Sequence, residues 1–267
     1  MTPDDATPGK ILSRQDGPIG WMVFSNPARL NAVSLEMWRA AGEVLEAFGR
    51  DASVRVVVVR GDGDKAFTSG GDISRFDPKQ SSEATRASAE RVRSHERHVL
   101  ATLDKPTIAM VRGYCLGGGL GWALNCDLRI CSDDAIFGLP VARMGTGYGA
   151  EGIRQLTDLV GPSATKEILF TGRQYTAHEA LRLGLVNQVV PAAELESTTR
   201  AYAEEIANNA PLAVLNAKTA VNELVKDPAD RDMALVARRA GDANRSEDYV
   251  EGRRAFMEKR KPVFKGK

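Results

Sequence analysis

The chain has 267 residues, of which 43% are hydrophobic and 27% charged. This composition is typical of a soluble globular protein with one large domain, or one domain and a small appendage. The 36 Lys and Arg residues nearly balance the 35 Asp and Glu residues. The chain therefore lacks the strong net positive charge that would attract nucleic acid or an anionic membrane. The polar N-terminus lacks the apolar core of a signal peptide, and no apolar run is long enough to span a bilayer.

The first half of the chain predicts strands that alternate with helices. The run Val56–Val59 is β-branched without polar alternation, which is typical of a strand covered on both faces. Before it, we expect a flexible tail over 1–9, a strand over 19–25 and a helix over 34–48. After it, we expect a polar loop over 61–72 and a long charged helix over 83–103.

The second half continues this alternation and then becomes helical. Thr176 and Glu179 form a capping box that opens a helix ending near Leu183. The other predicted elements are strands over 107–113, 127–132 and 185–190, a helix that starts at the glycines of 117–119, another that starts at Gly161–Pro162, and helices over most of 192–260. The order predicts an α/β core with parallel strands. We divide the chain into a tail (1–9), a core (10–191) and a C-terminal helical region (192–267).

Two glycine-rich turns are the strongest candidates for a functional site. SGGD (69–72) and LGGG (116–119) each follow a predicted buried strand. Alone, each could be a tight turn. Ligands of α/β proteins bind beyond the carboxyl ends of parallel strands, and glycine lets a ligand approach a backbone N–H closely. Two such N–H groups aimed at one carbonyl oxygen would form an oxyanion hole, which the dipole of the helix at 118 would strengthen.

Other residues with catalytic or metal-binding potential suit less specialised roles. His95 and His98 lack acidic or thiol companions at ligand spacing, so we interpret them as surface residues and predict no metal site. The cysteines are an odd number in apolar contexts, which indicates buried reduced thiols of a cytoplasmic protein; they are Cys115, Cys126 and Cys131.

Six motifs in order make the chain resemble the crotonase superfamily, the enoyl-CoA hydratase/isomerase family. They are NPARLNAVSLEM (26–37), KAFTSGGDI (65–73), KPTIAMVRGYCLGGGLGWALNCDLRI (105–130), FGLPVARMGTG (137–147), TGRQYTAHEALRLGLVNQVVP (171–191) and EGRRAFMEKRKPVF (251–264). The resemblance covers nearly the whole chain. It implies a spiral of repeated ββα units with a C-terminal helical trimerisation region, assembled as a homotrimer or a dimer of trimers.

The resemblance also implies a ligand and its contacts. The ligand is an acyl-CoA, with coenzyme A as part of the substrate and no separate cofactor. The oxyanion-hole donors carry over to the N–H groups of Gly71 and Gly118. Phe256 and Lys259 match positions that reach the CoA of a neighbouring subunit. Contacts with the substrate within one chain carry over to Ala28, Arg29, Leu30, Ala66, Ser69, Gly70, Asp72, Ile73, Leu116, Gly117, Pro140 and Val141.

The chain departs from the family hydratases at two positions. Those enzymes carry one glutamate two residues after the GGG and another after the proline of the FGxP segment, where this chain has Gly121 and Val141. Hydration of a double bond needs one group to activate water and one to transfer a proton. Glycine and valine can do neither, so ordinary hydration is not expected.

Residues 144–156 could supply a replacement. Tyr148 resembles a tyrosine that the methylmalonyl-CoA decarboxylase branch places at its active site, and the dihydroxynaphthoyl-CoA synthase branch has an aspartate near this position. Glu151 could be a displaced general base or a carboxylate favoured by the helix dipole. Arg143 could hold a substrate carboxylate or be exposed to solvent.

Three functions follow from these residues. We favour an enzyme that forms a thioester enolate for decarboxylation, carbon–carbon cleavage or a double-bond shift. The alternatives are an enoyl-CoA hydratase or isomerase that uses Glu151, and a catalytically silent acyl-CoA-binding protein.

Overall fold

The computed structural model describes residues 8–71, 91–92, 95 and 97–267. Most of the predicted tail over 1–9 and most of the predicted helix over 83–103 lie outside these residues. So do two candidate site residues, Asp72 and Ile73. Of the predicted helix, residues 91, 92, 95 and 97–103 are described, and all of these except 102 and 103 are helical.

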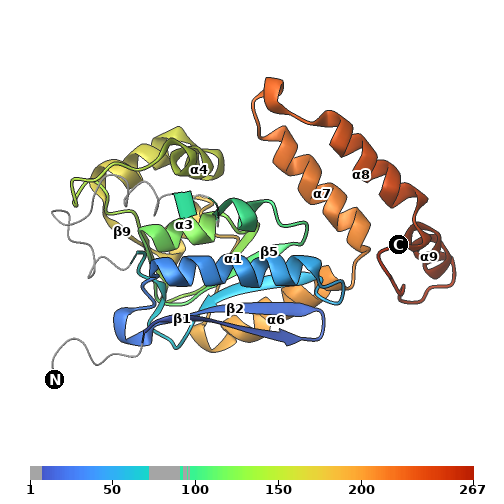
Figure 1. Cartoon of the computed structure of the whole chain (residues 1–267), viewed down its shortest axis with the longest axis horizontal. Coiled ribbons are helices and arrows are strands. Elements are labelled where there is room, and N and C mark those ends of the chain that lie inside the picture. Colours follow the sequence, from blue (N-terminus) through green and yellow to red (C-terminus); the bar gives the residue numbers. More distant parts are fainter. Residues whose placement is uncertain (1–7, 72–90, 93–94, 96) are drawn as a thin grey trace.

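Within the described residues, a six-stranded sheet forms the base of the core (Figure 1). Its order is β1 (Lys10–Asp16), β2 (Ile19–Ser25), β3 (Val56–Gly61), β5 (Thr107–Val111), β7 (Leu128–Ser132) and β10 (Gln188–Val190). Every neighbouring pair is parallel except β1 and β2. The prediction of parallel strands is therefore confirmed, and Val56–Val59 is buried throughout, as its composition indicated.

A second, smaller sheet carries the two glycine turns. Its order is β4 (Ala66–Thr68), β6 (Tyr114–Leu116), β8 (Ile136–Gly138) and β9 (Gln174–Thr176). The prediction of an uninterrupted loop over 61–72 was wrong, because β4 lies inside it. A strand of three residues is too short to show a hydrophobic period, and it is held by pairing with its neighbours.

The core helices begin where local capping signals place them. The Ser34 hydroxyl caps α1 (Leu35–Arg50), and the predicted capping box of Thr176 and Glu179 opens α5 (Ala177–Arg182). The short helix α3 (Gly118–Leu124) follows the GGG run. The predicted helix start at Gly161–Pro162 is confirmed. The element α4 (Ala150–Thr171) consists of two helices that meet at Gly161, whose φ of 78° and ψ of 165° are not helical, and the second helix begins with Pro162.

The C-terminal helices divide into one that packs on the core and an arm that stands away from it (Figure 1). Helix α6 (Leu195–Ala207) buries Leu195 and Ala203 against the six-stranded sheet. The arm contains α7 (Pro211–Leu224), α8 (Met233–Arg245) and α9 (Glu247–Met257). Lys218 of α7 bonds to Asp127 at 2.8 Å and ties the arm to the core. The boundary at residue 192 stays a prediction. Among the described residues, no helix combines the length and apolar character needed to cross a membrane.

Candidate active site

The two glycine turns lie against each other at one edge of the small sheet. A Cβ built on Gly70 would stand 3.0 Å from the amide nitrogen of Gly118. A Cβ built on Gly118 would stand 3.4 Å from the amide nitrogen of Gly71. Among the described residues, neither of these two amides has a recorded acceptor within the chain. Two backbone donors from distant parts of the sequence therefore lie beside each other without an internal partner.

The run of three glycines has a steric explanation. Gly117 has a φ of 53°, a conformation that favours glycine. A Cβ on Gly119 would stand only 2.2 Å from the carbonyl oxygen of Thr68, so α3 can approach β4 only without a side chain there. Gly118 lies in the first turn of α3, where an N–H has no acceptor within the helix. Because these glycines have no side chains, the start of α3 packs directly against the other glycine turn.

The segment before α1 joins the same region. The Ser69 amide donates to the Leu30 carbonyl at 2.9 Å, and the Ser69 hydroxyl donates to the Arg29 carbonyl at 3.3 Å. The buried Asn31 side chain donates to the Ala66 carbonyl at 2.7 Å. These bonds and the close approach of the two turns bring together seven of the sequence-predicted contacts: Arg29, Leu30, Ala66, Ser69, Gly70, Leu116 and Gly117. Ala28 precedes Arg29 in a short 3-10 helix over Pro27–Arg29.

Tyr148 lies over the next turn of α3. Its hydroxyl oxygen is 3.4 Å from the point where a Cβ on Gly121 would stand, and that oxygen is the only neighbouring atom recorded within 4 Å of this point among the described residues. The ring lies on Gly152, where a Cβ would be 2.7 Å from the ring carbon Cε1. Burial raises the pKa of Tyr148, partly opposed by the positive charge of Arg97. The hydroxyl is therefore a neutral hydrogen-bond donor at physiological pH.

Side-chain amides hold α3 and α4 together at this point. Asn125 donates to the Gly121 carbonyl at 2.7 Å, and Gln155 donates to the Asn125 side-chain oxygen at 2.9 Å. Because Gly121 lies on α3 and Gln155 on α4, this chain of bonds fixes Tyr148, at the entrance to α4, relative to α3.

The remaining candidates before α4 lie on a more exposed turn. Pro140 and Val141 are half-buried and begin the turn that leads to Tyr148. Glu151 is exposed in the first turn of α4. Arg143 is also exposed, and its side chain lies against Gly172, which caps the opposite end of α4 from Tyr148.

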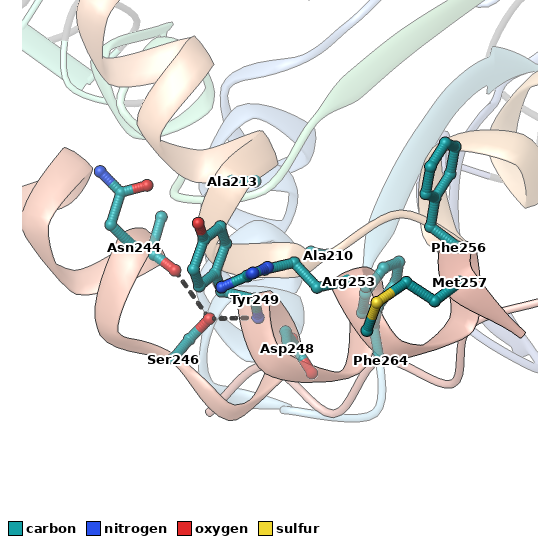
Figure 2. Close-up of a pocket in the computed structure, with 12 residues that line it drawn as sticks. Ala210, Ala213, Asn244, Ser246, Asp248, Tyr249, Arg253, Phe256, Met257 and Phe264 are labelled. Carbon is teal, nitrogen blue, oxygen red and sulfur yellow. Dashed lines mark hydrogen bonds between the residues drawn. The ribbon is translucent and has the colours of Figure 1, made fainter.

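Phe256 and Lys259 are not brought to the glycine turns within one chain. Both lie at the end of α9, on the arm (Figure 1), and Phe256 is 85% exposed. Phe256 lines a cavity of about 540 Å³ that is formed by residues of α7, α8, α9 and the C-terminal segment. Figure 2 shows the residues that line it. Its lining includes Ala213, Tyr249 and Phe264.

Comparisons with known proteins identify the family of this chain. The family model described as enoyl-CoA hydratase/isomerase matches residues 14–267. A short-chain-enoyl-CoA hydratase of Clostridium acetobutylicum is 34% identical over 251 residues, which is 94% of this chain and 95% of that protein. A carnitinyl-CoA dehydratase of Salmonella enteritidis is 34% identical over 259 residues, covering 95% of this chain and 97% of that protein. The solved structure of an enoyl-CoA hydratase/carnithine racemase from Magnetospirillum magneticum superposes with a TM-score of 0.91 at 33% identity, covering 96% of each chain.

The chain belongs to the enoyl-CoA hydratase/isomerase family. It is an acyl-CoA enzyme of this crotonase superfamily, and its mixed α/β fold is the one that the solved family structures have. The family resemblance expects a hydratase glutamate at Gly121. The structure puts the Tyr148 hydroxyl beside that position instead.

Several residues that shape this family site were missed from the sequence. Asn31 lies inside the recognised NPARLNA segment, and its buried position beside Asn26 could have been inferred from that motif. Asn125 and Gln155 act through a contact between helices, which leaves no local signal. Gly152 acts through its packing against the ring of Tyr148, four residues before it. Among the described residues, no group of three or more His, Cys, Asp and Glu side chains could hold a metal ion.

Proposed function

We propose that this protein converts an acyl-CoA through a thioester enolate. The Gly71 and Gly118 amides would hold the negative oxygen, and coenzyme A would enter only as part of the substrate. The proximity of the two amides, without recorded acceptors among the described residues, supports this role. In other enzymes, removing one such donor raises the barrier by about 3–4 kcal/mol.

The observation that carries the choice of reaction is the contact of Tyr148 with Gly121. Hydration needs a base for water, and neither Gly121 nor Val141 can be one. A partly buried tyrosine with a raised pKa is a proton donor rather than a base. We therefore favour reactions in which the enolate forms by cleavage of a carbon–carbon bond. A double-bond shift would also form the enolate, but a base such as Glu151 would first have to remove a proton.

Decarboxylation illustrates the proposed chemistry. The bond between Cα and the carboxylate breaks, CO₂ leaves, and the electron pair passes into the enolate, whose oxygen lies between the Gly71 and Gly118 amides. Tyr148 then gives its proton to Cα and regains one from solvent. The net reaction consumes one proton and yields the shortened acyl-CoA. A carbon–carbon cleavage would use the same hole and the same proton donor. A double-bond shift would use the same hole, with a base such as Glu151 taking a proton from one carbon before a proton is added at the other.

A second candidate is hydration or isomerisation of an enoyl-CoA with Glu151 as the base. The curated relatives named as a hydratase and a dehydratase favour it, and Glu151 lies three residues beyond Tyr148, in the first turn of α4. Replacement of Glu151 by Gln would then abolish activity on 2-enoyl- or 3-enoyl-CoA. Retained activity would exclude this candidate.

We also propose that the protein works as a homotrimer or a dimer of trimers. The arm supports this, because Phe256 and Met257 of α9 are 85% and 72% exposed in the single chain. Large exposed apolar side chains mark surfaces for a partner. In such an assembly, Phe256 and Lys259 would reach the CoA of a neighbouring subunit. Light scattering of the purified protein would test the assembly.

Exchange in D₂O tests the proposed function. The protein is incubated with saturated, unsaturated, β-keto and malonyl-type acyl-CoAs, and deuterium at the α-carbon is read by mass spectrometry. Deuterium together with loss of CO₂ or a moved double bond would support enolate chemistry. Thioesters that bind but return unlabelled would instead favour a catalytically silent binder.

A further inference from the structure

Thr68 is the last residue of β4 and contacts both glycine turns. Its side chain is fully buried, and its hydroxyl oxygen accepts a hydrogen bond from the Gly70 amide at 3.1 Å. Its carbonyl oxygen and its methyl carbon Cγ2 lie against Gly119, where an added Cβ would stand 2.2 and 2.9 Å from them. One residue therefore touches both the turn that carries Gly71 and the helix that carries Gly118.

Two hydrogen bonds determine the direction of the Gly71 N–H. This N–H belongs to the same planar peptide group as the Gly70 carbonyl, which accepts from the Val33 amide at 2.8 Å. The preceding peptide group is held at the Gly70 amide by the Thr68 hydroxyl. Gly70 lies between these two anchored planes with a φ of 106°. Loss of either anchor would therefore free the backbone to rotate at Gly70.

The glycines themselves do little to fix the turn. Glycine adopts positive and negative φ values about equally readily, so two in succession give the backbone little preference of its own. A Cβ built on Gly71 would have no neighbour within 4 Å among the described residues, so close packing does not restrain this position either. The shape of the turn therefore depends on its hydrogen bonds, and Thr68 supplies one of them from a side chain.

We propose that Thr68 is a positioning residue for the oxyanion hole. Its hydroxyl holds the Gly70 peptide so that the Gly71 N–H stays directed at the substrate oxygen, beside the Gly118 N–H. This inference rests on the proposed enolate function and names a residue on which the hole depends. Without the hydroxyl, the buried Gly70 amide would lose its acceptor, which favours rotation of the turn toward another one. The hole would then lose the fixed orientation of its donors, on which its effect depends.

Infrared spectroscopy of bound butyryl-CoA tests this inference. The difference between spectra with ¹²C and ¹³C at the thioester carbonyl isolates the band of that bond, and hydrogen bonds to its oxygen lower the frequency. We expect the wild-type protein to lower it relative to free butyryl-CoA. Thr68→Val should lose about half of this shift or more, because one of two donors is misdirected. Thr68→Ser keeps the acceptor and should retain the shift.

Kinetics on the substrate found by the exchange experiment give a second measurement. Thr68→Val should lower kcat about tenfold and leave KM within about twofold, because the misdirected donor acts mainly in the transition state. Thr68→Ser should keep kcat within about twofold of the wild-type value. A purely structural role for Thr68 would change the free energy of unfolding without this separation of kcat from KM.

A second pair of variants and a control complete the experiment. Thr68→Cys differs from Thr68→Ser by one atom, and because sulfur is a weak acceptor, its shift should be intermediate. This pair carries the comparison if the valine variant does not fold. Thr165→Val is the control. Thr165 is also buried, and its hydroxyl bonds to the Gly161 carbonyl at 2.9 Å within α4, so its loss should leave the carbonyl band unchanged.

The possible outcomes separate this inference from the proposed function. It is overturned if Thr68→Val retains the full shift, if Thr68→Ser loses as much of it as Thr68→Val, or if Thr68→Ser and Thr68→Cys give equal shifts. A wild-type protein that does not bind butyryl-CoA, or binds it without shifting the band, would contradict the proposed oxyanion hole as well. A wild-type shift that does not depend on the Thr68 hydroxyl would overturn this inference alone.

Discussion

The hydroxyl oxygen of Tyr148 lies 3.4 Å from the position that a Cβ of Gly121 would occupy. The family resemblance expects a catalytic glutamate at this position. Gly121 has no side chain, and the hydroxyl of a tyrosine from another segment lies in the space that the glutamate would fill. The tyrosine hydroxyl is neutral and comes from the segment before α4. A glutamate carboxylate would be negatively charged and would come from α3, so the two groups differ in charge and in the direction from which they approach. The following predictions depend on this relationship and on the residues that maintain it.

Removing the Tyr148 hydroxyl should remove proton transfer. We expect Tyr148→Phe to lower kcat by about 10²–10⁴-fold, the usual contribution of a positioned acid, because the ring still fills the space on Gly152. Steady-state kinetics on the substrate found by the exchange experiment would measure it. Tyr202→Phe, on α6, is the matched control and should be silent. Unchanged turnover in Tyr148→Phe would show that the hydroxyl has no catalytic role.

Gly152 should act as a positioning residue for Tyr148. A Cβ there would lie 2.7 Å from Cε1 of the tyrosine ring, so Gly152→Ala must displace the ring. We expect a loss of kcat that approaches that of Tyr148→Phe, and little further loss when the two changes are combined. Gly147→Ala is the control, because its added Cβ has no recorded neighbour within 4 Å. Additive losses in the double variant would argue against this role.

Two neighbouring glycines of α3 should respond to alanine with opposite signs. At Gly121 the nearest recorded atom is the Tyr148 hydroxyl oxygen at 3.4 Å, so Gly121→Ala should stabilise the helix by about 0.5–1 kcal/mol. At Gly119 the added Cβ would stand 2.2 Å from the Thr68 carbonyl oxygen, and overpacking should cost about 1–3 kcal/mol. Chemical denaturation of both variants would measure the difference. Equal stabilities would contradict the packing described here.

Ionisation of Tyr148 should cause no fall in activity below pH 10. Burial raises the pKa of Tyr148 above the ordinary value of 10.0 for a tyrosine, while the charge of Arg97 lowers this pKa and Cys115 raises it further. The protonated hydroxyl is the active form, so activity should fall only as pH rises through this raised pKa. Because the folded pKa exceeds the unfolded one, its contribution to stability is complete below the unfolded pKa and is lost above the folded pKa.

Profiles of kcat/KM between pH 6 and 10 for the wild type and Tyr148→Phe would check this expectation. An alkaline limb near pH 8 that disappears in Tyr148→Phe would show that the pKa is lowered instead. Arg97→Met should move the limb still higher, because it removes the charge that lowers the pKa.

The thiols should resist alkylation in the folded protein. Burial, the largest cause in each case, raises the pKa of Cys126 and Cys131 to about 12 and that of Cys115 well above its ordinary value. The thiolate is the reactive form, so iodoacetamide at pH 8 should add no mass to the native protein. In denaturant it should add three adducts. Labelling of the native protein at the denatured rate would refute the burial of these cysteines.

Much of the core could be predicted from the sequence because its signals are local. The β-branched run Val56–Val59 indicated a strand buried on both faces, and the capping box at Thr176 indicated the start of α5. The three-residue strands could not be predicted, since pairing with their neighbours decides them. The break at Gly161–Pro162 could be predicted, since both residue types act locally on the backbone.

By itself, the sequence determined the family, the two glycine turns and the absence of carboxylates at Gly121 and Val141, because residue identities and their spacing carry that information. Only the tertiary structure decided what replaces those carboxylates. The position of the Tyr148 hydroxyl over Gly121, and that of the Arg97 guanidinium 5.8 Å from the Trp38 ring centroid, each join segments far apart in the chain. Such contacts depend on how helices pack across the core. Packing between distant elements produces no periodic pattern of residues, so the sequence alone does not predict it.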